Sequence, residues 1–359
     1  MTKIRNSETP DTDLLFGRLK KKVKPIFDIA KKNLKEKKRA IELEDVIGFG
    51  GFAVVAKGHI DLSWYGKNLE DYPCAVKIPY PGRMYGEDPD TNEANRKRFI
   101  NEYSSTRQVF TNLEKLGTGL EKHIIRAYDY GEFDAEYREK DIDMEGIWKI
   151  KNIAKMFNKR LISWRYMVSE YVEGKELSQY RSKISIKDLV RVGEIVCQVL
   201  EITHDQDFLH RDIKPTNILI PNNKIWDLKL GDFGLAKRLD IATPFYSSIL
   251  GSVGFAAPEQ MDPKSLYPVD NRTDIYGLAA TIYFMATGHY VYDENDAKLL
   301  IGKENRQISR AVPLNEYINE PNLEELSEVL DTALSPYREK RYANVSEFKA
   351  ALNKVYKKL

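Results

Sequence analysis

The segment from His210 to Asn217 reads His-Arg-Asp-Ile-Lys-Pro-Thr-Asn, and the apolar run 218–220 follows it. It sets an acid, a cation and an amide at short spacings between a helical pattern and a strand-like one. Asp232-Phe233-Gly234 begins 15 residues after Asn217, and Ala257-Pro258-Glu259 comes further on. One short motif is easily matched by chance, whereas this ordered series is highly specific. The series therefore guides the interpretation of the rest of the chain.

A glycine-rich turn stands upstream between two strand-like pieces and reads Gly48-Phe49-Gly50-Gly51-Phe52-Ala53-Val54-Val55. Because glycines lack Cβ, they allow backbone N–H groups to approach phosphates closely. A dinucleotide-binding fingerprint is the main alternative, but its glycines open a helix, whereas residues 52–58 continue as a strand. The turn predicts a phosphate-binding loop between strands.

Two charged residues belong to the same pattern. In Cys74-Ala75-Val76-Lys77-Ile78, alternation places Ala75 and Lys77 on one face of a strand. Glu102 lies on the apolar stripe of a helix predicted near Phe99 to Leu116. A carboxylate there needs a partner, and pairing with Lys77 would satisfy both charges. Otherwise Lys77 is an ordinary exposed charge and the pair a salt bridge at the rim.

These motifs resemble the signature of the eukaryotic-like (Hanks-type) serine/threonine protein kinases, from about Ile47 to Leu352. Asp274 resembles the family's buried aspartate that braces the catalytic loop, and Arg341 resembles the arginine that pairs with Glu259. The composition, rich in lysine, isoleucine and asparagine, indicates a bacterial member. The resemblance implies an α+β, bilobal fold: a small β-rich N-lobe with one key helix, and a larger, mainly helical C-lobe.

The resemblance also implies the catalytic roles. Asp212 would accept the proton of the substrate hydroxyl, and Lys214 would lie beside the γ-phosphate, as in kinases specific for serine and threonine. Lys77, braced by Glu102, would hold the α- and β-phosphates. The expected activity is transfer of the γ-phosphate of ATP to serine or threonine hydroxyls of other proteins, with autophosphorylation of the activation segment.

The implied cofactors are ATP and Mg²⁺, or Mn²⁺ in its place, with Asn217 and Asp232 as metal ligands. The nucleotide would be bound by the glycine-rich turn, by apolar residues around the adenine and by backbone groups at its edge. These residues are Ile47, Gly48, Gly50, Gly51, Ala53, Val55, Ala75, Lys77, Glu170, Val172 and Leu219.

Regulation by phosphorylation is a further expectation. Arg211 resembles the arginine that, in many kinases, pairs with a phosphate on the activation segment. Within residues 235–256, Ser248 is favoured for that phosphate, Ser247 is its neighbour, and Ser252 is better placed to contact the catalytic loop. Alternatively, all three are ordinary loop hydroxyls.

The chain departs from the family pattern in three places. Ala53 replaces the third glycine of the turn, and Gly231, directly before Asp232, is expected to loosen the backbone there. The polar stretch 135–163 is long and has no family counterpart, and stretches 60–73 and 79–95 are likewise predicted as surface excursions.

Composition sets the broad class. The chain has 359 residues, 42% hydrophobic and 31% charged, with a formal net charge of +2. These values indicate a globular protein and no specific nucleic-acid partner. Cys74 and Cys197 form no metal-ligand spacing, and the most apolar stretch, Tyr276 to Ala286, is too short to span a bilayer. A cytoplasmic protein without a transmembrane segment is therefore expected.

Three parts are predicted along the chain: a basic helical extension over 1–40, the N-lobe over 41–172 and the C-lobe over 173–359. The extension carries an apolar stripe at helical spacing, formed by Phe16, Leu19, Val23, Phe27, Ala30 and Leu34. Packing on the main body is favoured for it, ahead of docking on an acidic partner or binding to a membrane surface.

Two other functions fit parts of the pattern. A pseudokinase that binds nucleotide as a scaffold would not need a complete set of lysine, glutamate, base and metal ligands, which this sequence has. A small-molecule kinase of related fold would lack the Ala-Pro-Glu segment and its arginine partner. The protein kinase is therefore the preferred interpretation.

Overall fold

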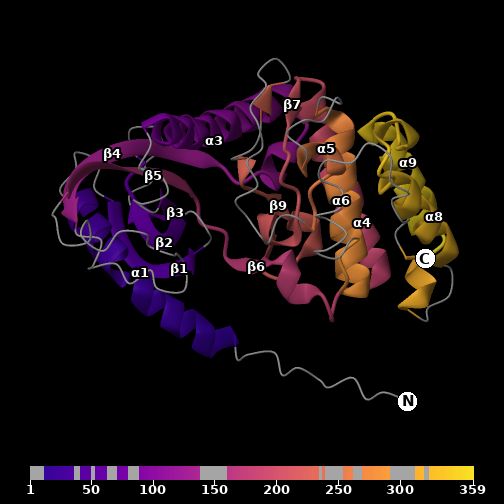
Figure 1. Cartoon of the computed structure of the whole chain (residues 1–359), viewed down its shortest axis with the longest axis horizontal. Helices are drawn as coiled ribbons and strands as arrows, with labels where there is room; N and C mark the ends of the chain where they lie inside the picture. The colour runs from indigo at the N-terminus through magenta and orange to yellow at the C-terminus, as the bar shows by residue number, and fades with distance from the viewer. Residues whose placement is uncertain are drawn as a thin grey trace. The chain divides into compact units, whose positions relative to one another are not determined.

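The computed structural model describes residues 12–35, 41–49, 53–62, 71–79, 89–137, 160–233, 237–238, 254–261, 269–291, 312–318 and 323–359. Contacts divide the chain into two compact units. The N-terminal unit comprises residues 1–96 and 127–171, and the C-terminal unit comprises 97–126 and 172–359. The first is built on one large sheet and the second is mainly helical, which confirms the predicted α+β, bilobal fold (Figure 1).

An antiparallel sheet of five strands forms the N-terminal unit, in the order β1-β2-β3-β5-β4. Its strands are β1 (Ile41–Phe49), β2 (Ala53–Ile60), β3 (Tyr72–Pro79), β4 (Ala127–Tyr137) and β5 (Arg160–Glu170). Along β3, Cys74, Val76 and Ile78 are fully buried, whereas Ala75 and Lys77 are half-buried. Successive side chains of a strand point to opposite faces, so the predicted alternation is confirmed.

Helix α1 (Thr12–Lys35) completes the core of this unit and lies beside the sheet in Figure 1. Ile26, Ala30 and Leu34 recur every fourth residue, so they share one helix face, and all three are fully buried in the same apolar cluster as the inner residues of β2 and β3. Of the predicted stripe, Phe27, Ala30 and Leu34 are buried here, while the side chains of Phe16, Leu19 and Val23 lie outside the described residues. The lysines at 24, 31, 32 and 35 are exposed.

Two predicted excursions are partly wrong. β4 and β5 form a long hairpin whose pairing continues to Ala135↔Ile162 and Tyr137↔Arg160, because this polar stretch still satisfies its backbone groups as a ladder. Residues 138–159 lie outside the described residues. Within 79–95, helix α3 (Pro89–Leu116) already begins, with proline at its first position, where the missing N–H has no helical partner to lose.

The C-terminal unit contains the part of α3 from Lys97 onward. Its other helices are α4 (Ile186–His204), α5 (Pro258–Met261), α6 (Asn271–Thr287), α8 (Leu323–Ala333) and α9 (Val345–Tyr356). Its strands are β6 (Gly174–Glu176), β7 (Phe208–Leu209), β8 (Ile218–Pro221), β9 (Lys229–Leu230) and β10 (Lys237–Arg238). Short 3-10 helices cover Leu120–His123, Leu177–Tyr180, Pro215–Asn217, Ile225–Asp227, Leu314–Glu316 and Arg338–Lys340.

Side-chain caps fix where the two central helices start. The Ser185 hydroxyl accepts a hydrogen bond from the Asp188 N–H at 3.0 Å at the start of α4, and the Asp270 carboxylate accepts one from the Arg272 N–H at 2.9 Å at the start of α6. Helix α6 contains the most apolar stretch of the sequence and is buried on nearly all sides. Among the residues that the structure describes, no helix is both long and apolar enough to cross a membrane.

Three short strands position the polar residues of the site. β7 leads into loop 210–217, β8 follows this loop, and β8 pairs with β9 through Ile218↔Leu230. Asp232 comes directly after β9 and one glycine. The pairing of β8 with β9 therefore brings the end of loop 210–217 next to the segment that contains Asp232.

Candidate active site

Loop 210–217 brings three of the predicted catalytic residues into direct contact. The Lys214 ammonium donates to Oδ2 of Asp212 at 2.8 Å. The Asn217 amide nitrogen donates to the same oxygen at 3.1 Å and to the Asp212 carbonyl at 2.7 Å. The Asp212 carboxylate is thus oriented by two neighbours of the same loop.

The backbone of this loop is anchored by Asp274, the fully buried residue in the first turn of α6. Its carboxylate accepts the N–H of His210 at 2.8 Å and the N–H of Arg211 at 2.7 Å, and Nε2 of His204 donates to it at 2.8 Å. Burial alone would raise the pKa of Asp274, but these donors hold that pKa below its usual range. A buried carboxylate that stays ionised fixes two consecutive amides of the loop.

His210 connects the loop to the residues before Asp232. Its Nε2 lies 3.0 Å from the Gly231 carbonyl, and its Nδ1 lies 3.3 Å from the Asp212 N–H. Since a carbonyl only accepts and an N–H only donates, these contacts require a neutral ring with its proton on Nε2. Burial lowers the pKa of His210, which favours the same form. The ring also packs on Phe233 with 4.5 Å between centroids.

The expectation that Gly231 loosens the backbone is wrong. Its N–H donates to the Asn217 carbonyl at 2.9 Å and its carbonyl accepts from His210, so both backbone groups are held. A Cβ at this position would meet the end of the Ile125 side chain, so the backbone here is also closely packed. The bond to Asn217 also fixes the start of the Asp232 segment against β8.

Helix α5 is fixed by a buried ion pair. Arg341 donates through both terminal nitrogens to the Glu259 carboxylate, at 2.8 and 2.9 Å, and the Thr273 hydroxyl donates at 2.8 Å. Burial alone would raise the pKa of Glu259, but the guanidinium of Arg341 and the hydroxyl hold it below its usual range. Two of the residues predicted as structural are thus in bidentate contact.

Two residues with clear contacts were missed by the sequence. His204 donates to Asp274, and Gln260 bonds both the loop and the segment before α5. His204 belongs to no motif, and Gln260 directly follows Glu259 of the Ala-Pro-Glu motif, which assigns it no role. Only their buried polar character could have signalled them, and burial is not visible in a single sequence.

The comparison with known families decides the identity of this arrangement. A family model described as the protein kinase domain matches residues 140–356, more than half of the chain. The chain belongs to the protein kinase family. The matched range contains loop 210–217, Asp232, Glu259, Asp274 and Arg341, and it begins after β4.

Relatives of this kinase family member are found among bacterial proteins. A probable serine/threonine-protein kinase of Clostridium perfringens is 32% identical over 54% of this chain and 27% of its own length. Serine/threonine-protein kinase F of Synechocystis is 32% identical over 52% of the chain and 36% of its own length. Serine/threonine-protein kinase PknF of Mycobacterium tuberculosis is 29% identical over 64% of the chain and 43% of its own length. The chain therefore spans less than half of these relatives.

In the N-terminal unit of this kinase chain, the sheet presents several predicted nucleotide-binding residues on one face. The register Val55↔Lys77 places these two side chains together on the face that also carries Ala75, because directly opposed residues share a face. Gly48 is opposite Val55, Glu170 is opposite Cys74, Ile47 is 39% exposed and Ala53 is buried.

Other predicted residues belong to the C-terminal unit. Glu102 is 5% exposed on α3, and Val172 and Leu219 are half-buried. Because Lys77 and Glu102 lie in different units, their pairing stays a prediction, as does an adenine site that draws on both units. Gly50, Gly51, Ser247, Ser248 and Ser252 lie outside the described residues.

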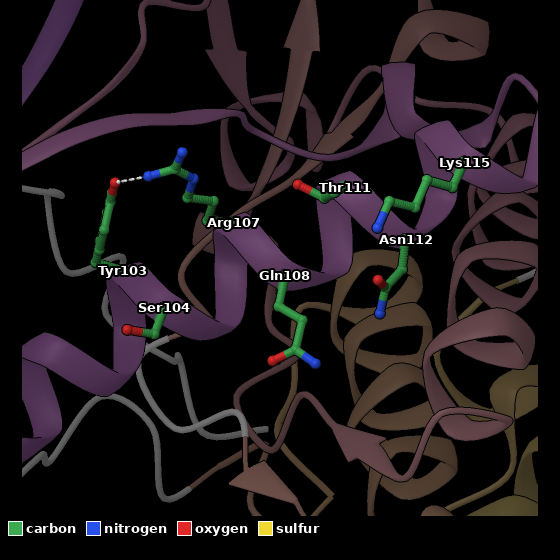
Figure 2. A pocket seen from close by; sticks show the side chains of 7 residues that line it. All are labelled: Tyr103, Ser104, Arg107, Gln108, Thr111, Asn112 and Lys115. Carbon is green, nitrogen blue, oxygen red and sulfur yellow. Dashed lines mark hydrogen bonds between the residues drawn. The ribbon is translucent and has the colours of Figure 1, made fainter.

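A shallow hollow runs along the exposed side of α3 and is unrelated to this loop. Its lining is polar, and Figure 2 shows Arg107 donating to the Tyr103 hydroxyl, a bond of 2.7 Å. All of the lining residues belong to this one helix: Tyr103, Ser104, Arg107, Gln108, Thr111, Asn112 and Lys115. The hollow contains none of the residues that the motif series predicts.

Proposed function

We propose that this chain is an active serine/threonine protein kinase that transfers the γ-phosphate of Mg-ATP to protein hydroxyls. The observation that carries the proposal is the Asp212 carboxylate, oriented by Lys214 and Asn217 in a loop that Asp274 anchors. The names of the relatives, all serine/threonine-protein kinases, support the same activity.

The contacts of Asp212 suggest how it would act. Among the described residues, both side chains that donate to it do so at Oδ2, so Oδ1 is left for the hydroxyl of an incoming serine or threonine. That hydroxyl would pass its proton to the carboxylate as it attacks phosphorus, while the bond from the γ-phosphorus to the leaving oxygen breaks. The ammonium of Lys214 would stabilise negative charge on the phosphoryl oxygens during transfer.

The chain's own residues fit a magnesium ion. The bonds from Asn217 to Asp212 use its amide nitrogen, so its amide oxygen is left as a metal ligand. The exposed Asp232 would supply a carboxylate. Mg²⁺ favours oxygen ligands in combination with substrate phosphates, and Mn²⁺ accepts the same set. When bound, the metal ion would neutralise phosphate charge.

The proposal extends to residues in both units. Lys77, with Glu102 as its brace, would hold the α- and β-phosphates, and Ile47, Val55, Ala75 and Leu219 would enclose the adenine. The division at 40/41 and 172/173, the regulatory roles of Arg211, Ser247, Ser248 and Ser252, and a cytoplasmic location belong to the same proposal. An acidic partner for α1 has less support, because part of its apolar face is buried in its own unit.

The first test is transfer of labelled phosphate from Mg-ATP to the chain itself and to a generic basic protein. We expect phosphate on serine and threonine, and Asp212→Asn should reduce the rate by about 10²–10⁴-fold because a general base is lost. The matched control is Asp205→Asn, an exposed carboxylate seven residues earlier that should leave the rate unchanged.

The pseudokinase alternative predicts a different result. Nucleotide would bind, but the wild-type chain and Asp212→Asn would transfer equally little phosphate. That outcome would overturn the proposed activity and leave nucleotide binding as the function of the site.

A further inference from the structure

Arg211 adopts an unusual backbone conformation directly before the proposed base. Its φ is 66°, in the left-handed region, which costs a non-glycine residue on the order of 1–3 kcal/mol and persists only when the surroundings enforce it. The N–H of Arg211 is held by Asp274 at 2.7 Å. Its carbonyl is held by a second side chain, because Nε2 of Gln260 donates to it at 2.9 Å.

The other end of the Gln260 amide is engaged as well. Its Oε1 accepts a hydrogen bond from the Ala257 N–H at 3.0 Å, and Gln260 is only 5% exposed. Ala257 is fully buried, so its N–H needs a partner inside the protein. One side chain therefore satisfies a buried backbone N–H and a partly buried backbone carbonyl on segments that lie 46 residues apart.

The glutamine is itself held in place by its neighbour. Glu259 precedes it in α5 and is fixed by Arg341 and Thr273. The amide of Gln260 thus rests on a turn that cannot shift without breaking a buried ion pair. A rigid series of contacts runs from that pair to the residue before Asp212.

We propose that Gln260 is a positioning residue for Asp212, which holds the left-handed Arg211 backbone and couples the loop to the segment that enters α5. The inference rests on the proposed kinase activity. It assigns to Gln260 the contact that holds the Arg211 carbonyl, whereas Asp274 holds the Arg211 N–H. These two contacts together form a clamp on the Arg211 backbone. A side-chain amide offers a donor and a strong acceptor together, whereas ionised glutamate lacks the donor and methionine has no donor and only a weakly accepting sulfur.

The test uses the full chain with three variants. Gln260→Met keeps the shape and removes both bonds, whereas Gln260→Glu keeps the acceptor for the Ala257 N–H and removes the donor. Gln108→Met is the matched control, because Gln108 is an exposed glutamine on α3. For each variant we would measure kcat, the stoichiometry and Kd of a non-hydrolysable ATP analogue, and amide hydrogen exchange over 205–217 and 254–261.

We expect kcat to fall about tenfold to a hundredfold in both Gln260 variants, because small misplacement of a reacting group is costly. The Kd of the ATP analogue and its binding stoichiometry should stay within about twofold, since no Gln260 contact involves a proposed nucleotide ligand. Exchange at 205–217 should rise about tenfold in both variants, as expected for the loss of one buried hydrogen bond. Exchange at 254–261 should rise with methionine and much less with glutamate.

Three results would overturn the inference. The first is a kcat per binding site equal to wild type, with only the folded fraction reduced, which would indicate a merely structural role. The second is full recovery of kcat in Gln260→Glu, which would show that the bond to Arg211 is not needed. The third is unchanged exchange at 205–217 in Gln260→Met. Amide hydrogen exchange does not depend on catalytic turnover. If the wild-type chain proved inactive, the proposed activity would be wrong, but hydrogen exchange would still test the contacts of Gln260.

Discussion

Each unit has an apolar core of its own, and the C-terminal unit adds a network of buried polar contacts. Around loop 210–217, buried polar side chains are paired in a network that includes Asp274 with His204, Glu259 with Arg341, and Gln260. The core of the N-terminal unit is an apolar cluster between α1 and the sheet. Hydrogen bonds are directional and apolar contacts are not. The polar network therefore fixes angles and distances, whereas the apolar cluster between α1 and the sheet, called the apolar platform below, supports the sheet by packing.

This difference shows which segments depend on an accurately held backbone conformation. A loop with a left-handed residue needs several directional contacts to stay in one conformation, whereas a sheet defines its own geometry through its ladder. Buried polar groups are costly when any member loses its partner. The C-terminal unit should therefore respond sharply to the removal of one hydrogen-bonding atom, and the N-terminal unit to lost volume.

The largest expected effect is on the buried ion pair. Glu259→Gln should lower the free energy of unfolding by about 3–5 kcal/mol, because it leaves the Arg341 guanidinium buried without a counter-charge. The matched control is Asp28→Asn in the exposed Lys24–Asp28 pair, whose 2.9 Å separation is similar. There the loss should be at most about 0.5 kcal/mol.

Urea denaturation at fixed pH and salt measures both values. Equal losses in the two variants would remove the contrast between buried and exposed pairs on which the comparison rests. A loss in Glu259→Gln that disappears in 1 M salt would show that the pair is more solvated than its burial indicates.

The next effect is on the apolar platform. Leu34→Ala should lower the free energy of unfolding by about 2–5 kcal/mol, because Leu34 is fully buried between α1 and the sheet and leaves a cavity. Lys32→Ala, on the exposed side of the same helix, should change it by less than about 0.5 kcal/mol.

At a temperature where both variants are folded, kcat should match wild type, because the folded N-terminal unit keeps the conformation of its sheet. A loss of kcat in folded Leu34→Ala that exceeds the loss in Gln260→Met would reverse the comparison. It would place the demanding geometry in the N-terminal unit.

The third expected effect is a gradual loss of stability and of kcat as the pH falls. Burial lowers the pKa of His210 below its ordinary value of 6.5, so the folded state favours the neutral ring. His210 therefore contributes stability that is fully present above pH 6.5 and is lost as pH falls through the lower folded pKa, because the unfolded chain takes up the proton first. Protonation of Nδ1 would also break its bond to the Asp212 N–H, so kcat should fall over the same range.

Unfolding free energies and phosphate-transfer rates measured between pH 8 and pH 5 test this. In His210→Gln, the free energy of unfolding should fall less steeply as the pH is lowered. Burial also lowers the pKa of His123, so part of the slope should remain. Gln108→Met, an exposed change that involves no titratable group, is the control and should keep the full pH dependence. A free energy of unfolding that decreases toward high pH would contradict the neutral form assigned to His210.

The sequence predicted the parts of the site that motifs encode. The bilobal α+β fold and the kinase family are confirmed, and the residues of the catalytic loop lie in contact with one another. The pair of Glu259 and Arg341, 82 residues apart, was expected only through the resemblance. Spacing alone cannot indicate a contact over that distance.

What the sequence missed depends on tertiary packing. Gln260 and His204 act through single hydrogen bonds to distant segments, and such bonds have no periodic pattern. The extension of the β4–β5 hairpin and the early start of α3 were missed because polar residues there resemble a loop in sequence. Gly231 was misjudged, since its backbone is held by hydrogen bonds to Asn217 and His210 that a sequence does not reveal.

The burial of α1 has a practical consequence for anyone who shortens this chain. The family match begins at residue 140, and trimming to that range would remove α1 and most of the sheet. Even a milder cut at Ile41 would uncover the apolar surface that Ile26, Ala30 and Leu34 shield. Large exposed apolar patches promote aggregation, so solubility would be the first property to suffer. The part of α1 that packs on the sheet, from Ile26 to Leu34, should therefore be kept in any shortened version.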